Sequence, residues 1–242
     1  MGRGSAQSNR VRPLDALRGI RALLKNPDDT EKVFDIIDAL SGRAIERAFA
    51  RFESTETGRR LLEQQPDLVS VLNDQERLRA LPLGTLGRTY ADFVAREEIT
   101  ADGLVAASER DAEIDPSIPE KRYWFGARLR DMHDLWHVTT GYNRDLVGEA
   151  ALLAFSYAQI KNRGIGFIVL VAYLRANRTG APNARAMIRD GYRRGRDAAW
   201  LPAQDWESLL KRPLEDVRDE LRLGAPPEYE EFRSEGAPVL AS

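Results

Sequence analysis

The sequence predicts an all-α protein, a single-domain helical bundle with a metal site at a helical corner. First, strand signals are almost absent, because no stretch sustains the alternation of apolar and polar residues that a half-buried strand requires. Second, Ala, Leu, Arg and Glu, which favour helices, dominate the composition. Third, the only two histidines, His133 and His137, stand four residues apart, a spacing that places both side chains on one helix face.

The length of 242 residues is sufficient for one domain with a full hydrophobic core, and nothing marks a boundary between two smaller ones. We expect a flexible N-terminal tail over residues 1–11, a helical domain over 12–232 and a flexible C-terminal tail over 233–242. The formal net charge of -2 argues against a polyanion-binding surface, so we expect no nucleic-acid partner. The chain has no cysteine, so any metal site must consist of histidines and carboxylates.

The sequence shows neither a signal peptide nor a membrane-spanning helix. The first twelve residues lack the apolar core of a secretory signal. The most apolar run, Ile165–Leu174, is too short to cross a bilayer, which needs about 20 residues. We therefore expect a location in the cytoplasm, or peripheral binding to the inner face of the membrane.

The N-terminal part predicts four helices. A short helix over Pro13–Lys25 comes first, and a long one follows, with Gly42 as a tolerated weak point. The apolar residues of the long helix recur at three- and four-residue steps: Val33, Ile36, Ile37, Leu40, Ala44, Ala48 and Phe52. Ser54–Thr57 and Pro66–Asp67 are typical helix starts and open two shorter helices.

The middle of the chain leads up to the histidine motif. Leu81–Thr85 predicts a turn that ends in a helix cap, and the glycines at 84 and 87 permit close backbone approach. Tight helix packing is the favoured interpretation of these glycines, and a nearby ligand is the alternative. The helix that follows carries large apolar residues on one side: Tyr90, Phe93 and Val94. After an acidic loop at Asp111–Pro119, we expect a helix over Lys121–Leu129. Its aromatic residues Tyr123, Trp124 and Phe125 should wedge into the core, and a platform for a substrate ring is the alternative.

The histidine motif predicts a helical corner. A straight helix would carry Glu149 roughly 18 Å beyond His137, so the chain must bend for this carboxylate to join the imidazoles. Gly141 supplies the break, because glycine readily takes the left-handed conformation that ends a helix, and Asp145 can cap a second helix that packs back. Two histidines and one carboxylate then form a three-ligand site with an open position, as catalytic metal sites have.

Two alternatives remain at this motif. The histidines can simply share a helix face without binding anything, because short metal motifs also occur by chance. Asp134 points about 100° away from His133 around the helix, so it is a fourth ligand, a carboxylate supporting the ligands, or a base acting on metal-bound water.

The C-terminal part predicts two apolar helices and a basic one. The helix after Glu149 continues to Ile160, and Asn162–Gly164 turns the chain into the apolar run, so that the two helices could form an apolar pocket beside the metal. Pro182 starts a helix with four arginines on one face: Arg185, Arg189, Arg193 and Arg196. A solvated face is the favoured interpretation of this stripe, and an anionic membrane surface or a substrate carboxylate is the alternative.

Two short helices over Asp205–Leu210 and Pro213–Leu223 end the predicted fold. From Glu228 onward the chain is acidic, and we expect a mostly loose tail.

The motif H-D-L-W-H-V-x-T-G-Y…G-E over His133–Glu149 resembles that of the coenzyme Q (ubiquinone) biosynthesis family Coq4. The similarity extends from about residue 11 to about residue 230. It includes Leu81–Tyr90, which resembles the family's L-P-x-G-T-L-G-R-x-Y segment. Further matching segments are Arg21–Thr30, Asp205–Glu207 and Pro213–Leu214.

The resemblance implies one divalent metal ion, usually zinc. Its implied ligands are His133, Asp134, His137 and Glu149. It also implies loss of the C1 carboxylate from a polyprenylated hydroxybenzoate, in some accounts with hydroxylation of the same carbon. Asp134 is the candidate catalytic proton carrier. Candidate substrate-binding residues are Arg130 and Tyr142, with Val169 and Ala172 for the isoprenoid tail.

Two classes of function follow from these patterns. The first is a metal-dependent lyase, with ferrous iron in place of zinc if dioxygen takes part, since zinc does not change oxidation state. The second is a lipid-binding scaffold that presents isoprenoid intermediates to other enzymes of ubiquinone biosynthesis. A hydrolytic zinc enzyme is a weaker third hypothesis, because Asp134 replaces the glutamate of the H-E-x-x-H motif. Expected partners are polyprenylated benzoate or quinone intermediates, the other pathway enzymes, a membrane surface and, as a candidate assembly, a second copy.

Overall fold

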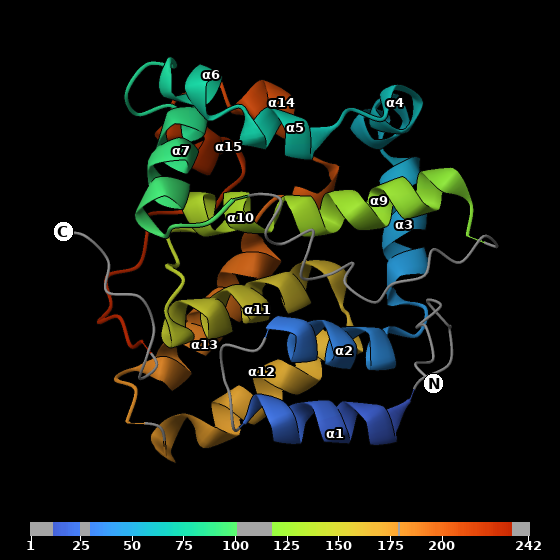
Figure 1. The fold of residues 1–242 in the computed structure, drawn as a ribbon, viewed down its shortest axis with the longest axis vertical. Coiled ribbons are helices and arrows are strands. Elements are labelled where there is room, and N and C mark those ends of the chain that lie inside the picture. Colours follow the sequence, from blue (N-terminus) through green and yellow to red (C-terminus); the bar gives the residue numbers. More distant parts are fainter. Residues whose placement is uncertain (1–11, 25–29, 101–117, 179, 234–242) are drawn as a thin grey trace.

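Helices α9 (Glu120–Asp131) and α10 (His133–Thr140) run end to end across the middle of the molecule (Figure 1). The computed structural model describes residues 12–24, 30–100, 118–178 and 180–233, and these contain helices but no strand. On one side of α9 and α10 lie α4 (Glu56–Gln64), α5 (Leu68–Asn73), α6 (Gln75–Arg79), α7 (Leu86–Arg96), α14 (Trp206–Leu209) and α15 (Leu214–Glu220). The predicted all-helical domain is confirmed.

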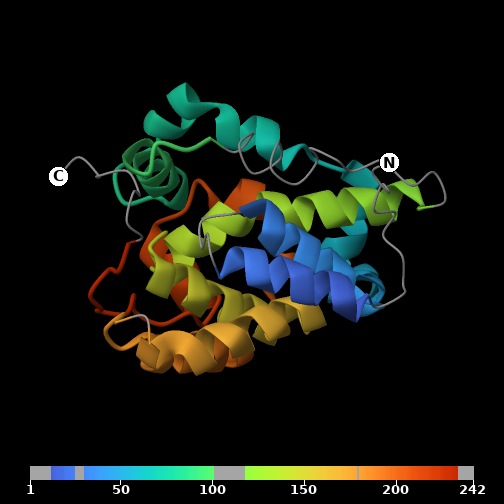
Figure 2. The same ribbon diagram turned by 60° about the horizontal axis from the view of Figure 1, so that its bottom comes forward.

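The other side holds the apolar helices. It consists of α1 (Pro13–Leu23), α2 (Thr30–Ser41), α11 (Leu146–Ile160), α12 (Arg163–Arg175), the 3-10 turn η1 (Ala176–Arg178) and α13 (Ala184–Asp197). Helix α3 (Ala44–Ser54) crosses between the two sides, and a second 3-10 turn, η2, spans Leu201–Ala203. Figure 2, with the lower side of Figure 1 turned forward, shows α1 beside α2, and α2 also packs against α12.

The predicted long helix through Gly42 is wrong, because the chain breaks there. Gly42 has a φ of +50°, a left-handed conformation that ends α2, and α3 starts two residues later. Both halves keep the predicted apolar face, since Ile36, Ala48 and Phe52 are all buried. The apolar period predicted the buried residues correctly but did not reveal the change of direction.

The capping residues fulfil most other expectations. Thr55, Asp67, Thr85 and Asn162 each accept a hydrogen bond from a backbone amide in the first turn of the helix that follows. The basic helix starts at Ala184, two residues after the expected Pro182. Of its four arginines, three are exposed, whereas Arg185 donates to the carbonyl of Tyr173 at the end of α12. The solvated-face interpretation therefore holds for most of the stripe.

The Leu81–Tyr90 and Asp205–Leu214 segments, far apart in the sequence, pack against each other. The amide of Gly87 donates to the carbonyl of Leu210 at 2.8 Å, and a Cβ atom at position 87 would lie 2.9 Å from that oxygen. Close packing, the favoured interpretation, thus explains Gly87. Gly84 has a φ of +82° and open space around it, so its turn conformation is the reason for glycine there.

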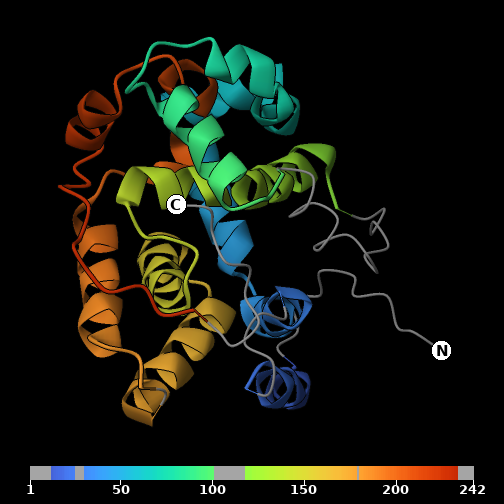
Figure 3. The same cartoon turned by 60° about the vertical axis from the view of Figure 1, so that its left-hand side comes forward.

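The chain from Glu228 to Arg233 packs onto the molecule, so the expectation of a loose tail from Glu228 is wrong for this part. The segment descends from α15 past α13 and α11 (Figure 3). The Tyr229 hydroxyl donates to Asp145 at 2.6 Å, and Arg233 pairs with the buried carboxylate of Glu97 at 3.3 Å. We call residues 228–233 the C-terminal strap. The predicted tail at 1–11, the end of the first helix at Lys25, the loop at 111–117 and the tail from 234 lie outside the described residues.

Candidate metal centre

His133 and His137 face each other from successive turns of α10. Their Nε2 atoms are 3.2 Å apart, and the rings meet edge to face with centroids 4.8 Å apart. The Glu149 carboxylate comes from the first turn of α11, with Oε1 at 3.4 Å from Nε2 of His137 and Oε2 at 3.8 Å from Nε2 of His133. Among the described residues, these three side chains form a group that could hold a metal ion, and we call it the triad.

The predicted corner brings the triad together. Gly141 has a φ of +77° and ends α10, and its amide donates to the carbonyl of His137. Asp145 accepts hydrogen bonds from the amides of Val147 and Gly148 and so caps α11, as the sequence predicts. Glu149 therefore lies one turn into the second helix, opposite both imidazoles.

Two further contacts fix the orientation of the His137 ring. Its Nδ1–H donates to the carbonyl oxygen of Tyr142 at 2.8 Å, which leaves the lone pair on Nε2 facing His133 and Glu149. The ring of Phe93, from α7, stacks on it at 5.9 Å between centroids. A buried histidine held in this tautomer is ready to act as a metal ligand.

Opposed effects set the pKa values of the triad. Burial disfavours the charged form of Glu149, but His137, His133 and Arg144 outweigh it and lower its pKa to about 2. Burial also lowers the pKa of His133, together with the charge of His137. For His137, burial is outweighed by the charge and hydrogen bond of Glu149, so the pKa lies above its ordinary value. The carboxylate is thus ionised at neutral pH.

The donor atoms fit a divalent cation. Bonds of about 2.0–2.1 Å that meet near the tetrahedral angle would separate their donor atoms by about 3.3–3.4 Å. The two nitrogens are 3.2 Å apart, Oε1 of Glu149 lies 3.4 Å from His137 and Oε2 lies 3.8 Å from His133, and one donor atom from each residue lies within 4.8 Å of the others. Two imidazole nitrogens and one carboxylate suit zinc or ferrous iron, and a three-ligand set leaves positions open for other molecules.

Asp134 is buried beside the triad but is not among the three residues whose ligand atoms converge. Its charge raises the pKa values of both imidazoles. It also acts on Tyr90 of α7, whose pKa is raised mainly by burial and further by Asp134. This position favours the supporting role among the alternatives that the sequence left open.

A cavity of about 550 Å³ opens beside the triad, within the range of small-molecule sites at about 300–1,000 Å³. Most of its lining is aliphatic and comes from α1, α2, α11 and α12. His133 and Glu149 belong to its wall, as do the predicted tail-binding residues Val169 and Ala172. The apolar pocket expected between α11 and α12 is therefore present and reaches the triad.

The other predicted substrate-binding residues differ in position. Arg130 lines the cavity and pairs with Asp131 at 2.8 Å. Tyr142 does not line it: its hydroxyl donates to Asp190 at 2.9 Å, and its carbonyl holds His137. Tyr142 thus holds His137 from outside the cavity, and its position does not favour the predicted contact with a substrate.

Two residues at this site were missed by the sequence analysis. Arg144 lines the cavity with Nε 3.6 Å from Glu149, and this buried nitrogen has no hydrogen-bond partner. Its position in the predicted corner, between Gly141 and Asp145, was the one feature of the sequence that could have indicated a place near the triad. Phe232 of the C-terminal strap also lines the cavity, and nothing local in the sequence indicated this.

Comparisons with known proteins show which family the chain is similar to. Residues 12–227 match the family described as "Coenzyme Q (ubiquinone) biosynthesis protein Coq4". The ubiquinone biosynthesis protein coq-4, mitochondrial, of Neurospora crassa is 32% identical over 177 residues, or 73% of this chain and 49% of that protein. The corresponding protein of Schizosaccharomyces japonicus is 32% identical over 178 residues, covering 72% and 70%. That of Lachancea thermotolerans is 29% identical over 218 residues, covering 88% and 63%. The chain thus spans about half the length of the first of these relatives.

A crystal structure from Nostoc punctiforme, named "Putative ubiquinone biosynthesis protein", has the same fold. The TM-score is 0.64 at 23% identity, over 89% of this chain and all of that one. The relatives' names assign them to mitochondria, and the cytoplasmic location expected for this chain stays a prediction. None of the described helices is long and apolar enough to cross a membrane. With the family match covering nearly all of the helical domain, the chain belongs to the coenzyme Q (ubiquinone) biosynthesis family Coq4.

Proposed function

We propose that the chain acts in ubiquinone biosynthesis as a metal-dependent lyase that removes the C1 carboxylate from a polyprenylated 4-hydroxybenzoate. The observation that carries this proposal is the opening of the His133, His137 and Glu149 triad into a largely aliphatic cavity. Such a site suits an amphiphilic molecule with an anionic ring at the triad and an apolar tail along α12. The family membership supports the pathway, and the cavity supports the substrate class.

The triad would hold the ion through two neutral imidazoles and one carboxylate. A divalent ion bound there would supply an electrophilic centre for the negative charge that develops on the substrate. Zinc suits a simple decarboxylation, whereas consumption of dioxygen with C1 hydroxylation would require ferrous iron. His137 keeps its donor nitrogen directed at this position because Tyr142 holds the opposite ring nitrogen.

Two arginines in the cavity wall suit an anionic head group. The Nε of Arg144 lies 3.6 Å from Glu149, and Arg130 lies near the end of α9, three residues before His133. Guanidinium groups bind carboxylates through paired hydrogen bonds, so these side chains would hold the leaving carboxylate or a phenolic oxygen. The aliphatic wall would exclude water from the ring.

Decarboxylation requires one proton for each carbon dioxide released. The bond between C1 and the carboxyl carbon breaks, its electron pair stays with the ring, and a proton must then reach C1. Asp134 is the proposed proton carrier, because it is the buried acid next to the imidazoles. Asp134 does not line the cavity, and Nε2 of His133 would be occupied by the ion, so a proton from Asp134 would need a bridging water to reach C1.

The test is conversion by the purified chain alone. Protein prepared without chelator is analysed for metal and then incubated with a polyprenyl 4-hydroxybenzoate, and released carbon dioxide is measured. We expect turnover that is lost in Glu149→Gln, together with the metal. The exposed carboxylate of Glu215, paired with Arg218, provides the matched control, Glu215→Gln. Absence of turnover in the metal-loaded wild type would overturn the proposal.

The alternative is a scaffold that binds isoprenoid intermediates without converting them. The cavity favours this hypothesis as well, since it requires only an apolar pocket. The same preparation distinguishes the two functions: a scaffold binds the prenylated ligand with unchanged affinity in Glu149→Gln and releases no product in any variant.

A further inference from the structure

Two helices expose an unusual amount of hydrophobic surface. Of the eight large hydrophobic side chains that are exposed in the described part of the chain, five lie on α1, on its C-cap residue Leu24, or on α12. These are Leu14 (68%) and Leu17 (43%) on α1, Leu24 (39%) at its C-cap, and Leu170 (53%) and Leu174 (59%) on α12. Burying one leucine normally contributes favourable free energy, so a group of exposed ones indicates a surface with a partner.

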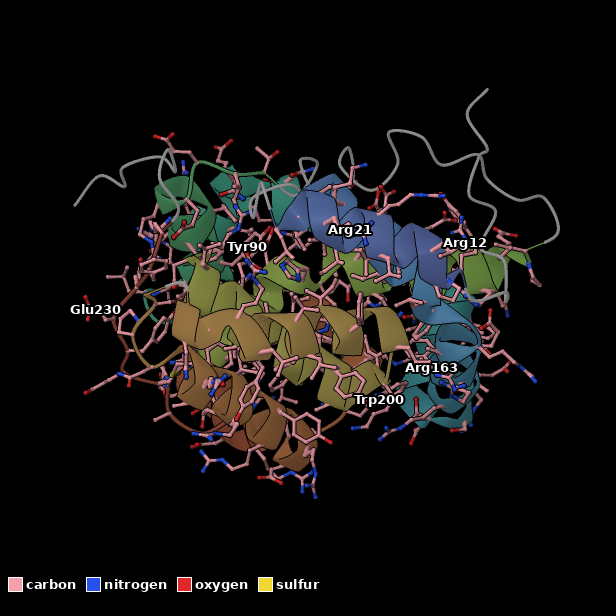
Figure 4. The ribbon with its side chains drawn as sticks, turned by 90° about the horizontal axis from the view of Figure 1, so that it is seen from below. Arg12, Arg21, Tyr90, Arg163, Trp200 and Glu230 are labelled. Carbon is pink, nitrogen blue, oxygen red and sulfur yellow. The ribbon has the colours of Figure 1, made fainter. Side chains whose placement is uncertain are left out.

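The two helices share one face of the molecule. Both lie at its lower edge in Figure 1, and the view from below in Figure 4 shows them on the same face. Each packs against α2, and Ile20, Ile36 and Ile168 from the three helices belong to one hydrophobic cluster. We call the exposed surface of α1 and α12 the leucine face.

The cavity reaches the surface at the leucine face. Leu24 and Arg175 line the cavity and are also exposed, one at the end of α1 and the other at the end of α12. The same cavity has His133 and Glu149 in its wall. A molecule entering between α1 and α12 would therefore come within reach of the triad.

Exposed basic side chains lie on the same two helices as the exposed leucines. Arg18, Arg21, Arg163 and Arg175 are exposed on these helices, and Figure 4 labels Arg21 and Arg163. Asp15 pairs with Arg18 at 2.7 Å and Asp35 pairs with Lys32 at 2.8 Å, which leaves Arg21, Arg163 and Arg175 as the basic excess among the described residues of this face. A twofold contact with a second copy would bring the arginines of the two faces together, and such like charges repel. Apolar side chains together with basic ones suit a surface of anionic lipid.

We propose that the leucine face docks on a lipid bilayer that contains anionic headgroups. Docking places the mouth of the cavity at the hydrocarbon boundary, where a long isoprenoid chain is dissolved. The choice of lipid as the occupant rests partly on the proposed isoprenoid substrate, whereas the docking itself depends only on this surface. The membrane contact expected from the sequence thereby gains a defined location.

The test is flotation of the purified full-length chain with vesicles. Phosphatidylcholine vesicles with phosphatidylglycerol should bind the protein, and vesicles of phosphatidylcholine alone should bind it at least several-fold more weakly. The double variant Leu170→Gln and Leu174→Gln should lose about tenfold or more in vesicle binding. The matched control is Leu83→Gln, 81% exposed in the turn between α6 and α7 at the opposite end of the molecule, which should bind like wild type.

Three results would overturn the proposal: wild-type vesicle binding by the double variant, equal binding to both kinds of vesicle, or a wild-type dimer that the double variant converts to monomer. The last result would assign the face to a second copy. Thermal melting of each variant excludes loss of folding as the cause. Glu149→Gln should bind vesicles like wild type although it loses the metal. Turnover therefore tests the lyase proposal and flotation tests the docking proposal, independently of each other.

Discussion

Replacing Asp145 with alanine should destabilise the chain by about 3–5 kcal/mol, because this one carboxylate holds the helical corner and the C-terminal strap together. Asp145 is almost fully buried and accepts four hydrogen bonds. They come from the amides of Val147 at 2.9 Å, Gly148 at 3.3 Å and Phe232 at 3.1 Å, and from the hydroxyl of Tyr229 at 2.6 Å. The substitution leaves all four donors without this acceptor.

The magnitude follows from two separate contributions. Loss of a helix N-cap costs about 0.5–2 kcal/mol, and each of the two bonds from the strap to a charged acceptor contributes about 1.5–3 kcal/mol. The total should stay below the simple sum, because one local rearrangement can provide partners for several freed donors. Tyr229→Phe removes two bonds, because the hydroxyl donates to Asp145 and also accepts from the amide of Asn143 at 2.9 Å, and it should cost about 2–4 kcal/mol.

Urea denaturation of metal-free protein measures these changes without a contribution from metal binding. Asp67→Ala is the matched control, because Asp67 caps α5 at an exposed position and holds no distant segment. It should cost only about 1 kcal/mol. If Asp145→Ala is no more destabilising than this control, the strap does not stabilise the corner and the reasoning is refuted.

Three further predictions concern the corner, the cavity and the metal. Gly141→Ala should lower the free energy of unfolding by well over 1 kcal/mol and weaken metal binding, because the position has a φ of +77° and the new Cβ would lie 2.5 Å from Pro226. Urea denaturation measures the first effect and calorimetry measures the second. Val169→Trp should fill the cavity and abolish binding of a prenylated ligand, while zinc affinity in the same titration stays at the wild-type value. Metal affinity should fall as the pH drops through the raised pKa of His137, because a proton then competes with the metal for Nε2, whereas Glu149 stays ionised down to about pH 2. Calorimetry in several buffers should detect the release of about one proton on metal binding. A metal affinity that is independent of pH would contradict this prediction.

The sequence by itself determined the local features of this protein. The spacing of His133 and His137, the break at Gly141 and the cap at Asp145 were all readable, because helix periodicity, left-handed glycine and N-caps depend on residues within a few positions of one another. The apolar run on α12 indicated a pocket for the same reason. The family resemblance followed from motifs that the sequence shows directly.

Only the tertiary structure decided how these pieces meet. The end of α2 at Gly42 was ambiguous, since glycine inside a helical pattern is tolerated or ends the helix according to what the next segment packs against. Arg144 became part of the site only when the corner turned it toward Glu149. The C-terminal strap is the clearest case, because an acidic segment that follows two prolines has no local preference for an ordered structure. It is held by Asp145 and Glu97, which are more than eighty residues away in the chain. Contacts of that range depend on the folded surface, which no local pattern encodes.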